Sequence, residues 1–241
     1  MKRIVCKNNE ELSRSGALMF AEQIWKKPDS VLCFASGGTP LGTYKYLAEM
    51  CKGGMVDFSR VTAFSHDEYY PISKANDHSL DNCMWKNLFS QINIDRNNVF
   101  LPNGGASDPK KACDEYEKRL ASCGGIDMQL LGVGHNGHIA FLEPADELPV
   151  NMNVITLTDK TIDANSRFFD SRDDVPRQAL SMGIGSVLST RRIIVLISGK
   201  SKAAIVQKMF SGVISTQVPA TLLQLHPNVV VILDEAAASL L

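Results

Sequence analysis

The chain has 241 residues, of which 44% are hydrophobic and 21% are charged, and its formal net charge is −1 at pH 7. This is the composition of an ordinary globular protein with a sizeable core, so it excludes a largely disordered chain. The near-neutral charge provides no field that would attract nucleic acid or an anionic membrane, and we expect neither as a partner. A charged small substrate would have to be held by local groups.

Targeting segments and cysteine motifs are missing from the sequence. The N-terminal stretch Met1–Cys6 has too short an apolar part for a signal peptide, and no run approaches the ~18 apolar residues of a membrane span. The six cysteines are scattered, without the spacing of zinc ligands or of a disulfide framework. We therefore expect free thiols in a cytoplasmic protein, with no metal and no cofactor.

The hydrophobic pattern predicts strands that alternate with helices from one end of the chain to the other. Strands are expected at residues 1–5, 31–35, 61–65, 99–101, 127–133, 153–158, 193–197 and 229–233. Helices are expected at 10–26 (capped by Asn8 or Asn9), 41–51, from Asp77 or Ser79 to 89, 109–122, 161–169 and 203–210, with a short apolar element at 181–188, a helical turn at 219–225 and a terminal helix capped by Asp234. This alternation predicts one domain, residues 1–241, with a Rossmann-like α/β/α fold of three layers and a mostly parallel central sheet.

The first candidate site motif, Ser36–Pro40, directly follows the apolar strand 31–35. Glycines at 37 and 38 let backbone N–H groups approach an anion, the hydroxyls of Ser36 and Thr39 add donors, and a helix N-terminus follows. This pattern favours a phosphate site, although a plain turn is the alternative. It is neither a Walker loop nor Gly-x-Gly-x-x-Gly, so it does not imply a nucleotide.

The second motif is the pair of carboxylates Asp67 and Glu68, which follows the strand 61–65. Because side chains alternate along an extended chain, the two carboxylates are expected to point in different directions. One would enter a cleft while the other makes structural hydrogen bonds. The alternative is a charged turn.

The third motif follows the apolar strand that ends at Gly132. It is a loop with two histidines, an asparagine and a glutamate, namely His135, Asn136, His138 and Glu143. In an open α/β sheet, ligands bind just past the carboxyl ends of the strands, which makes this loop a candidate catalytic segment. A glycine-rich turn with solvated side chains is the alternative, and His135 is expected to be a bystander.

Two basic segments complete the candidate site. Arg167 precedes Phe168 and Phe169, which are expected to pack inward, so Arg167 would either extend past them to solvent or form a specific ion pair. Lys202 ends a strand-to-helix turn, where a cation opposes the helix dipole unless an anion is bound. Together the motifs predict acid–base chemistry on a phosphorylated substrate.

With these motifs in this order, the chain resembles the short form of the glucosamine-6-phosphate deaminase (isomerase) family. The resemblance extends over nearly the whole chain, and the run from Asn136 to Pro144 is its most specific part. The matching stretches are Ser36–Pro40, Asp67–Tyr69, Gly132–Pro144, Asn165–Phe169, Gly199–Lys202 and Pro219–His226.

The resemblance implies conversion of glucosamine 6-phosphate and water into fructose 6-phosphate and ammonia, in amino-sugar catabolism. Asp67 matches the base that moves a proton from C2 towards C1, His138 matches the group that opens the pyranose ring, and Glu143 matches the carboxylate that assists it. A histidine suits ring opening because it titrates near neutral pH. The residues that match the phosphate cradle are Ser36, Gly37, Gly38, Thr39, Arg167 and Lys202.

Two positions depart from the family pattern. Asn136 stands where many members carry Asp, and because an amide cannot relay a proton we interpret Asn136 as a polar positioning residue. Leu142 stands where Asn is usual, which is expected to remove a hydrogen-bonding group from the rim of the site.

Alternative functions stay open at the level of sequence. The same chemistry on galactosamine 6-phosphate would give tagatose 6-phosphate, and nothing in the sequence indicates the configuration at C4. A 6-phosphogluconolactonase of the same fold is a second alternative, although Asp67–Tyr69 and Phe141–Pro144 favour the deaminase. A non-catalytic sugar-phosphate-binding regulator has no DNA-binding helix pair or basic patch to support it. The family includes monomers and hexamers, so the oligomeric state is open.

Overall fold

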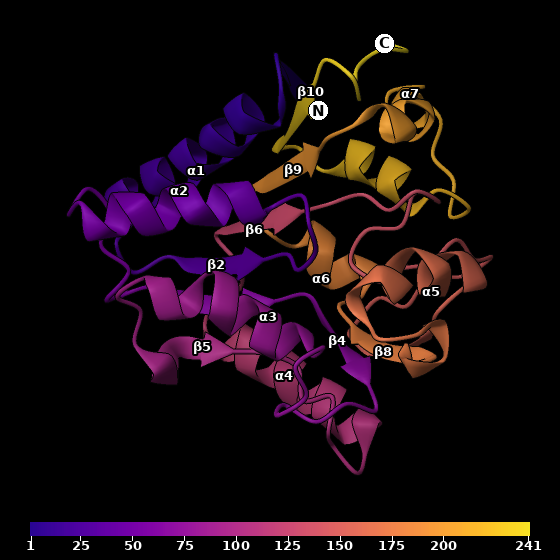
Figure 1. Cartoon of the computed structure of the whole chain (residues 1–241), viewed down its shortest axis with the longest axis horizontal. Coiled ribbons are helices and arrows are strands. Elements are labelled where there is room, and N and C mark those ends of the chain that lie inside the picture. Colours follow the sequence, from indigo (N-terminus) through magenta and orange to yellow (C-terminus); the bar gives the residue numbers. More distant parts are fainter.

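The computed structural model describes all 241 residues, and its centre is a seven-stranded parallel sheet between layers of helices (Figure 1). The strand order is β1-β10-β9-β6-β2-β3-β5, and every neighbouring pair is parallel. This confirms the predicted α/β fold. The strands are β1 (Lys2–Cys6), β2 (Val31–Phe34), β3 (Thr62–Ser65), β5 (Val99–Phe100), β6 (Met128–Leu131), β9 (Ile193–Ile197) and β10 (Val229–Asp234).

Four of the seven α-helices begin at a side-chain cap, namely α1, α3, α4 and α5. Asn8 accepts a hydrogen bond from the Glu11 amide and Ser79 accepts one from the Asn82 amide, which decides between the alternative caps that the sequence left open. None of the helices combines the length and apolar composition of a membrane span. The helices are α1 (Asn9–Lys26), α2 (Leu41–Lys52), α3 (Leu80–Asn87), α4 (Pro109–Ser122), α5 (Asp159–Asn165), α6 (Ile184–Leu188) and α7 (Ala203–Met209).

Two hydrophobic clusters lie on the two faces of the sheet. Along β2, Leu32 and Phe34 join the cluster beneath α1 and α2, while Val31 and Cys33 join the cluster that α4 covers. A strand buried on both faces needs apolar side chains at every position, which is why β2 reads as a continuous apolar run. Helices α1 and α2 pack side by side across their face of the sheet (Figure 1).

A second, smaller sheet was not predicted. It is antiparallel, with the order β4-β8-β7, and consists of β4 (Asp67–Tyr70), β8 (Gln178–Ser181) and β7 (Asn153–Thr156). Only His66 separates β3 from β4, so the chain leaves the large sheet and enters the small one within a single residue. The sequence did not indicate β4, because strands are predicted from apolar residues and this strand begins with two carboxylates.

The predicted terminal helix is wrong. Asp234 does accept a hydrogen bond from the Ala237 amide, at 2.7 Å, but residues 235–240 form turns. The same carboxylate also accepts hydrogen bonds from the Gly199 amide and the Ser198 hydroxyl. Asp234 therefore fastens the loop after β9 to the end of β10 and caps no more than one turn.

Gly104 holds the loop after β5 against β4, and this contact leaves no room for a side chain. A Cβ atom at residue 104 would lie 2.3 Å from the carbonyl oxygen of Tyr69 and 2.8 Å from Cγ of Glu68. The Gly104 carbonyl also accepts the Ile72 amide at 2.8 Å. The start of the small sheet thus depends on close backbone packing.

We expect Gly104→Ala to destabilise the protein by about 1–3 kcal/mol, the usual cost of forcing extra atoms into a packed interior. Urea unfolding measures the difference. Gly132→Ala is the matched control, because a Cβ atom there has no neighbour within 4 Å. Equal stability of the two variants would contradict the close packing of this loop on β4.

Candidate active site

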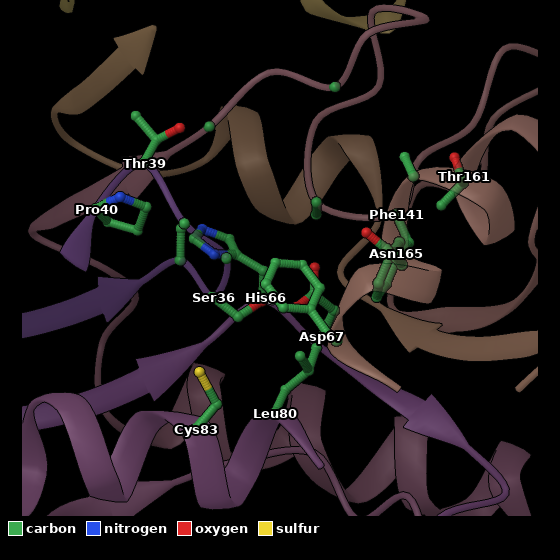
Figure 2. Close-up of a pocket in the computed structure, with 18 of the residues that line it drawn as sticks. Ser36, Thr39, Pro40, His66, Asp67, Leu80, Cys83, Phe141, Thr161 and Asn165 are labelled. Carbon is green, nitrogen blue, oxygen red and sulfur yellow. Dashed lines mark hydrogen bonds between the residues drawn. The ribbon is translucent and has the colours of Figure 1, made fainter. Parts of the chain in front are cut away.

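A cavity of about 610 Å³ lies at the carboxyl ends of the central strands. Its walls come from the segments that follow β2, β3, β6 and β9, from the start of α3 and from α5. This is the edge at which an open parallel sheet binds ligands. Figure 2 shows Ser36 beside Asp67 on one side of the cavity and Thr161 and Asn165 of α5 on the other. All the predicted site residues line the cavity except Glu143, which lies behind His138.

The loop Ser36–Thr39 forms one end of the cavity. Gly37 has a φ of 101°, a conformation that side-chain-bearing residues rarely adopt, and a Cβ atom at residue 37 or 38 would meet nothing within 4 Å. The backbone here is therefore open to the cavity. The loop leads directly into α2, whose N-terminus adds positive potential at the same end. These features are those of an anion site.

Two cations, Lys202 and Arg167, line the same cavity without a carboxylate partner. Lys202 donates a hydrogen bond from Nζ to the carbonyl oxygen of Val133 at 2.7 Å. Burial, together with the nearby charge of Arg167, lowers the pKa of Lys202 to about 8. Neither residue forms an ion pair within the protein. A bound anion would supply the missing opposite charge.

Arg167 is held by an aromatic side chain instead of an ion pair. Its guanidinium lies 4.7 Å from the ring centre of Phe168, which is 44% exposed. The prediction that both phenylalanines pack inward is therefore wrong for Phe168. Phe169 does pack inward, edge-on against Tyr69 with 5.2 Å between ring centres. The reason is that α5 ends at Asn165 and a tighter helical turn follows, which rotates Phe168 outward.

The two carboxylates at the start of β4 take different roles, as their alternation predicts. Asp67 lines the cavity, and its only side-chain hydrogen bond comes from the Ser36 hydroxyl at 3.3 Å. Glu68 turns away and accepts the amides of Tyr69, Leu80 and Asp81 at 2.7–2.9 Å. Glu68 thereby satisfies the first N–H groups of α3, whereas Asp67 is left to face the cavity.

Burial controls the ionisation of both carboxylates. Loss of water raises the pKa of Asp67 to about 7, and the charge of Glu68 contributes to this rise, against the hydrogen bond from Ser36. Burial also raises the pKa of Glu68 to about 7, although its three amide donors oppose the shift. Asp67 is thus a cavity-facing carboxyl whose pKa burial raises towards neutrality, which suits a general base.

His138 and Glu143 form the second reactive group. Nδ1 of His138 lies 3.7 Å from Oε2 of Glu143, and the Glu143 side chain is buried. Burial tends to raise the pKa of Glu143, but its contacts with His138, Thr161 and Asn136 outweigh this and hold the pKa below its ordinary value. A charged carboxylate behind the imidazole orients the ring and stabilises its protonated form.

Asn136 acts on both members of this pair. Its Nδ2 donates to Oε2 of Glu143 at 2.6 Å, and its Oδ1 accepts the backbone amide of His138 at 3.2 Å. This supports the prediction of a polar positioning residue. Gly134 makes room for the arrangement, because a Cβ atom there would lie 2.3 Å from the His138 ring. The loop can fold over the histidine only with glycine at that position.

Leu142 does not lie at the rim, which corrects the prediction from the sequence. Its side chain is fully buried in the core cluster that contains Ile139, and it does not line the cavity. The apolar side chain faces the protein interior because residues 139–142 form a tight turn, closed by the hydrogen bond from the Leu142 amide to the Ile139 carbonyl.

His135, expected to be a bystander, does line the cavity and has its Nε2 3.4 Å from the Ser201 hydroxyl.

Some residues of the site carried no signal in the sequence. The hydroxyl of Thr158 donates to Oε2 of Glu143 at 3.3 Å, and the Thr161 hydroxyl lies 3.4 Å from Nδ1 of His138. Thr158 also caps α5, so in the sequence the Thr-x-x-Thr spacing indicates no more than a helix start. Its proximity to Glu143 arises only from the fold.

Comparison with known proteins agrees with this geometry. The sequence model of the family described as glucosamine-6-phosphate isomerases/6-phosphogluconolactonase matches residues 7–232. A glucosamine-6-phosphate deaminase of Clostridium perfringens is 49% identical, and one of Halothermothrix orenii is 48% identical, each over the full length of both chains.

Solved structures give the same result. A structure described as a monomeric glucosamine-6-phosphate deaminase superposes with a TM-score of 0.98 at 43% identity and covers both chains completely. A 6-phosphogluconolactonase from Trypanosoma cruzi superposes with a TM-score of 0.78 at 20% identity, covering 99% of this chain and 96% of its own, which indicates a shared fold. The chain therefore belongs to the glucosamine-6-phosphate isomerase/6-phosphogluconolactonase family, as its motifs predict.

Proposed function

We propose that this protein is a glucosamine-6-phosphate deaminase, which converts glucosamine 6-phosphate and water into fructose 6-phosphate and ammonia. The observation that carries the proposal is the position of Asp67, a buried carboxyl with a pKa of about 7 that faces the cavity containing an anion cradle and a His–Glu pair. Full-length relatives named for this activity, at nearly half identity, support the same reaction.

The phosphate of the substrate binds at the Ser36–Thr39 loop. Backbone N–H groups and hydroxyls there, together with Lys202 and Arg167, provide charge-assisted hydrogen bonds to the dianion. The two unpaired cations gain a partner when the phosphate arrives. The sugar then extends from the cradle towards Asp67 and His138, which line the same cavity.

Ring opening uses His138. The imidazole accepts the proton of the hydroxyl on C1 and returns a proton to the ring oxygen, so that the bond between C1 and the ring oxygen breaks and C1 becomes an aldehyde. Glu143 stabilises the imidazolium that forms in between. Asn136 holds Glu143 and the His138 backbone in register during this exchange.

Isomerisation and deamination use Asp67. The carboxylate removes the proton from C2 of the open chain and delivers it to C1, while the protonated amine on C2 gives up one proton to the C1 oxygen, which leaves C1 as a hydroxymethyl group and C2 as an iminium. Water adds to C2, and ammonia leaves to give the ketose. A carboxylate with a pKa near 7 suits both halves of the transfer, because it accepts and releases the proton with similar ease.

We extend the proposal to the whole chain and its compartment. Residues 1–241 are proposed to act as one domain, because the two core clusters share the seven-stranded sheet and the small sheet continues from β3 through His66. All six cysteines are free in the structure. Free thiols fit a reducing compartment, which supports the cytoplasm.

The function is tested with three substrates supplied separately, namely glucosamine 6-phosphate, galactosamine 6-phosphate and 6-phosphogluconolactone. We expect glucosamine 6-phosphate to yield ammonia and fructose 6-phosphate in equal amounts. Faster ammonia release from galactosamine 6-phosphate would assign the other amino sugar. Lactone hydrolysis without ammonia from either amino sugar would overturn the proposal.

The protonation of Asp67 predicts the pH dependence. Because the base works only when ionised and burial raises its pKa to about 7, kcat/KM should fall as the pH drops below about 7. Asp67→Asn should reduce kcat by at least ~100-fold and abolish exchange of the C2 proton with solvent, while the substrate still binds. Solvent deuterium incorporation and calorimetric titration measure the two effects.

Glu68→Gln is the control for this assignment. It removes the neighbouring negative charge that helps to raise the pKa of Asp67. The acid limb of the pH profile, where kcat/KM falls as the pH drops, should therefore move to lower pH while exchange of the C2 proton persists. If Asp67→Asn retains exchange and Glu68→Gln loses it, Glu68 is the base and Asp67 takes no part in the proton transfer.

The phosphate cradle predicts a binding defect in Arg167→Ala. Loss of one charge-assisted hydrogen bond should raise KM for glucosamine 6-phosphate by roughly 10- to 100-fold with little change in kcat. Arg177→Ala is the matched control, because Arg177 is an exposed arginine that pairs with Asp173 away from the cavity. An unchanged KM in Arg167→Ala would remove Arg167 from the cradle.

A further inference from the structure

The phosphate loop follows the end of β2, and Asp67 follows the end of β3. A buried tyrosine hydroxyl forms a hydrogen bond to the backbone at each of these two strand ends. Tyr44 of α2 donates a hydrogen bond to the carbonyl oxygen of Ala35, the residue directly before Ser36. Tyr116 of α4 donates one to the carbonyl oxygen of Ser65, two residues before Asp67. Both hydroxyls therefore act on the backbone at the point where a strand gives way to site residues.

The two tyrosines approach from opposite faces of the large sheet. Tyr44 lies in the cluster beneath α1 and α2 and packs edge-on against Phe34, with 5.9 Å between ring centres. Tyr116 lies in the opposite cluster and packs edge-on against Phe64, at 5.6 Å. The strands that they hold, β2 and β3, are neighbours in register, with Phe34 opposite Ser65. One pair of adjacent strand ends is thus fixed from both sides.

The two contacts converge on the Asp67 carboxyl. The Ser36 hydroxyl provides the only side-chain hydrogen bond to Asp67, at 3.3 Å. Ser36 follows the carbonyl held by Tyr44, and Asp67 follows the carbonyl held by Tyr116. Because the Ser36 contact is long, the direction of the Asp67 carboxyl depends chiefly on the backbone that Tyr116 holds, whereas the Tyr44 contact acts mainly on the loop that begins at Ser36.

Packing alone does not explain the hydroxyl groups. Both rings are buried, at 1% and 7% exposure, among aromatic neighbours where phenylalanine would fill the same space. Burial raises the pKa of both phenols well above the ordinary value, so both remain neutral donors. A buried hydroxyl is retained at low cost only when it has a partner, and here each partner is a strand-end carbonyl.

We propose that Tyr44 and Tyr116 are positioning residues of the active site, Tyr44 for the phosphate loop that begins at Ser36 and Tyr116 for the base Asp67. This inference rests on the proposed function, since it assigns each tyrosine to one step of that reaction. The two residues have different consequences. Displacement of the loop weakens binding, whereas displacement of Asp67 slows proton transfer without loosening the phosphate.

The test uses Tyr44→Phe and Tyr116→Phe, each of which removes one oxygen atom. We expect Tyr44→Phe to raise KM for glucosamine 6-phosphate by about 5- to 30-fold with kcat within about twofold, the size of a lost buried hydrogen bond. Tyr116→Phe should lower kcat and C2-proton exchange by a similar factor with KM retained. Its acid limb should also move to lower pH, because a less confined Asp67 is better hydrated.

Two control variants separate positioning from stability. Tyr46 lies on α2, as Tyr44 does, and its hydroxyl is 3.3 Å from the Glu10 carboxylate of α1. Tyr46→Phe removes this hydroxyl and should leave kcat and KM unchanged. Ile232→Val opens a small cavity in the core at β10, away from the cavity of the site. It should lower the melting temperature without a selective change in either KM or kcat. Kinetic constants of both tyrosine variants that match those of Ile232→Val would overturn the inference.

A second readout keeps this inference separate from the proposed function. Titration with inorganic phosphate reports on the loop without turnover, and we expect weaker binding in Tyr44→Phe and unchanged binding in Tyr116→Phe. If the wild-type protein releases no ammonia from glucosamine 6-phosphate, the proposed function fails. Equal phosphate affinity in all variants would overturn the role of Tyr44, and a wild-type rate of C2 exchange in Tyr116→Phe would overturn that of Tyr116.

Discussion

The burial of one carboxyl group, Asp67, at the junction of two sheets is the constraint on which the site depends. The chain leaves the large sheet at Ser65 and enters the small sheet at Asp67, so this side chain lies where water is largely excluded. A carboxylate in such a place normally needs several donors, because burial penalises its charged form. Its neighbour Glu68 receives three backbone amides, whereas Asp67 receives one distant hydroxyl. Burial raises the pKa of both carboxyls to about 7, but hydrogen bonds hold Glu68 against α3, whereas Asp67 is left to face the cavity.

The same division recurs across the cavity. Against its burial, the pKa of Glu143 is held below its ordinary value chiefly by His138 and also by Thr161 and Asn136, and its charge acts through His138 on whatever the cavity holds. Lys202 and Arg167 line the same cavity without a counter-ion in the protein. Pairs of titratable groups whose surroundings push their pKa values apart are the usual mark of assigned acid and base roles. The two cations of the cavity lack an anionic partner within the protein, and a bound phosphate would supply it.

Much of this arrangement is visible in the sequence, because parallel strands appear as apolar runs and their carboxyl ends meet at one edge of the sheet. That rule alone is enough to gather Ser36, Asp67 and His138 at one site. It fails where local chemistry opposes the pattern, since Asp67–Tyr70 is a strand that begins with two carboxylates. It also fails where a side chain acts at long range in sequence, as with Tyr116, whose hydroxyl reaches a carbonyl 51 residues earlier. Leu142 shows the converse error, because a motif position says nothing about which way a tight turn directs its side chain.

The small sheet explains why binding and chemistry occur in one cavity. The segment that follows β7 is α5, and it carries Thr161 to His138 and ends just before Arg167. The phosphate loop and Lys202, in contrast, follow strands of the large sheet. A phosphate that contacts both Arg167 and Lys202 would therefore bridge segments from the two sheets across the cavity. The two sheets are also connected directly by the chain from Ser65 to Asp67. In the proposed reaction, binding energy gained at the phosphate would act on the position of Asp67, and a proton transfer between adjacent carbons is highly sensitive to that position.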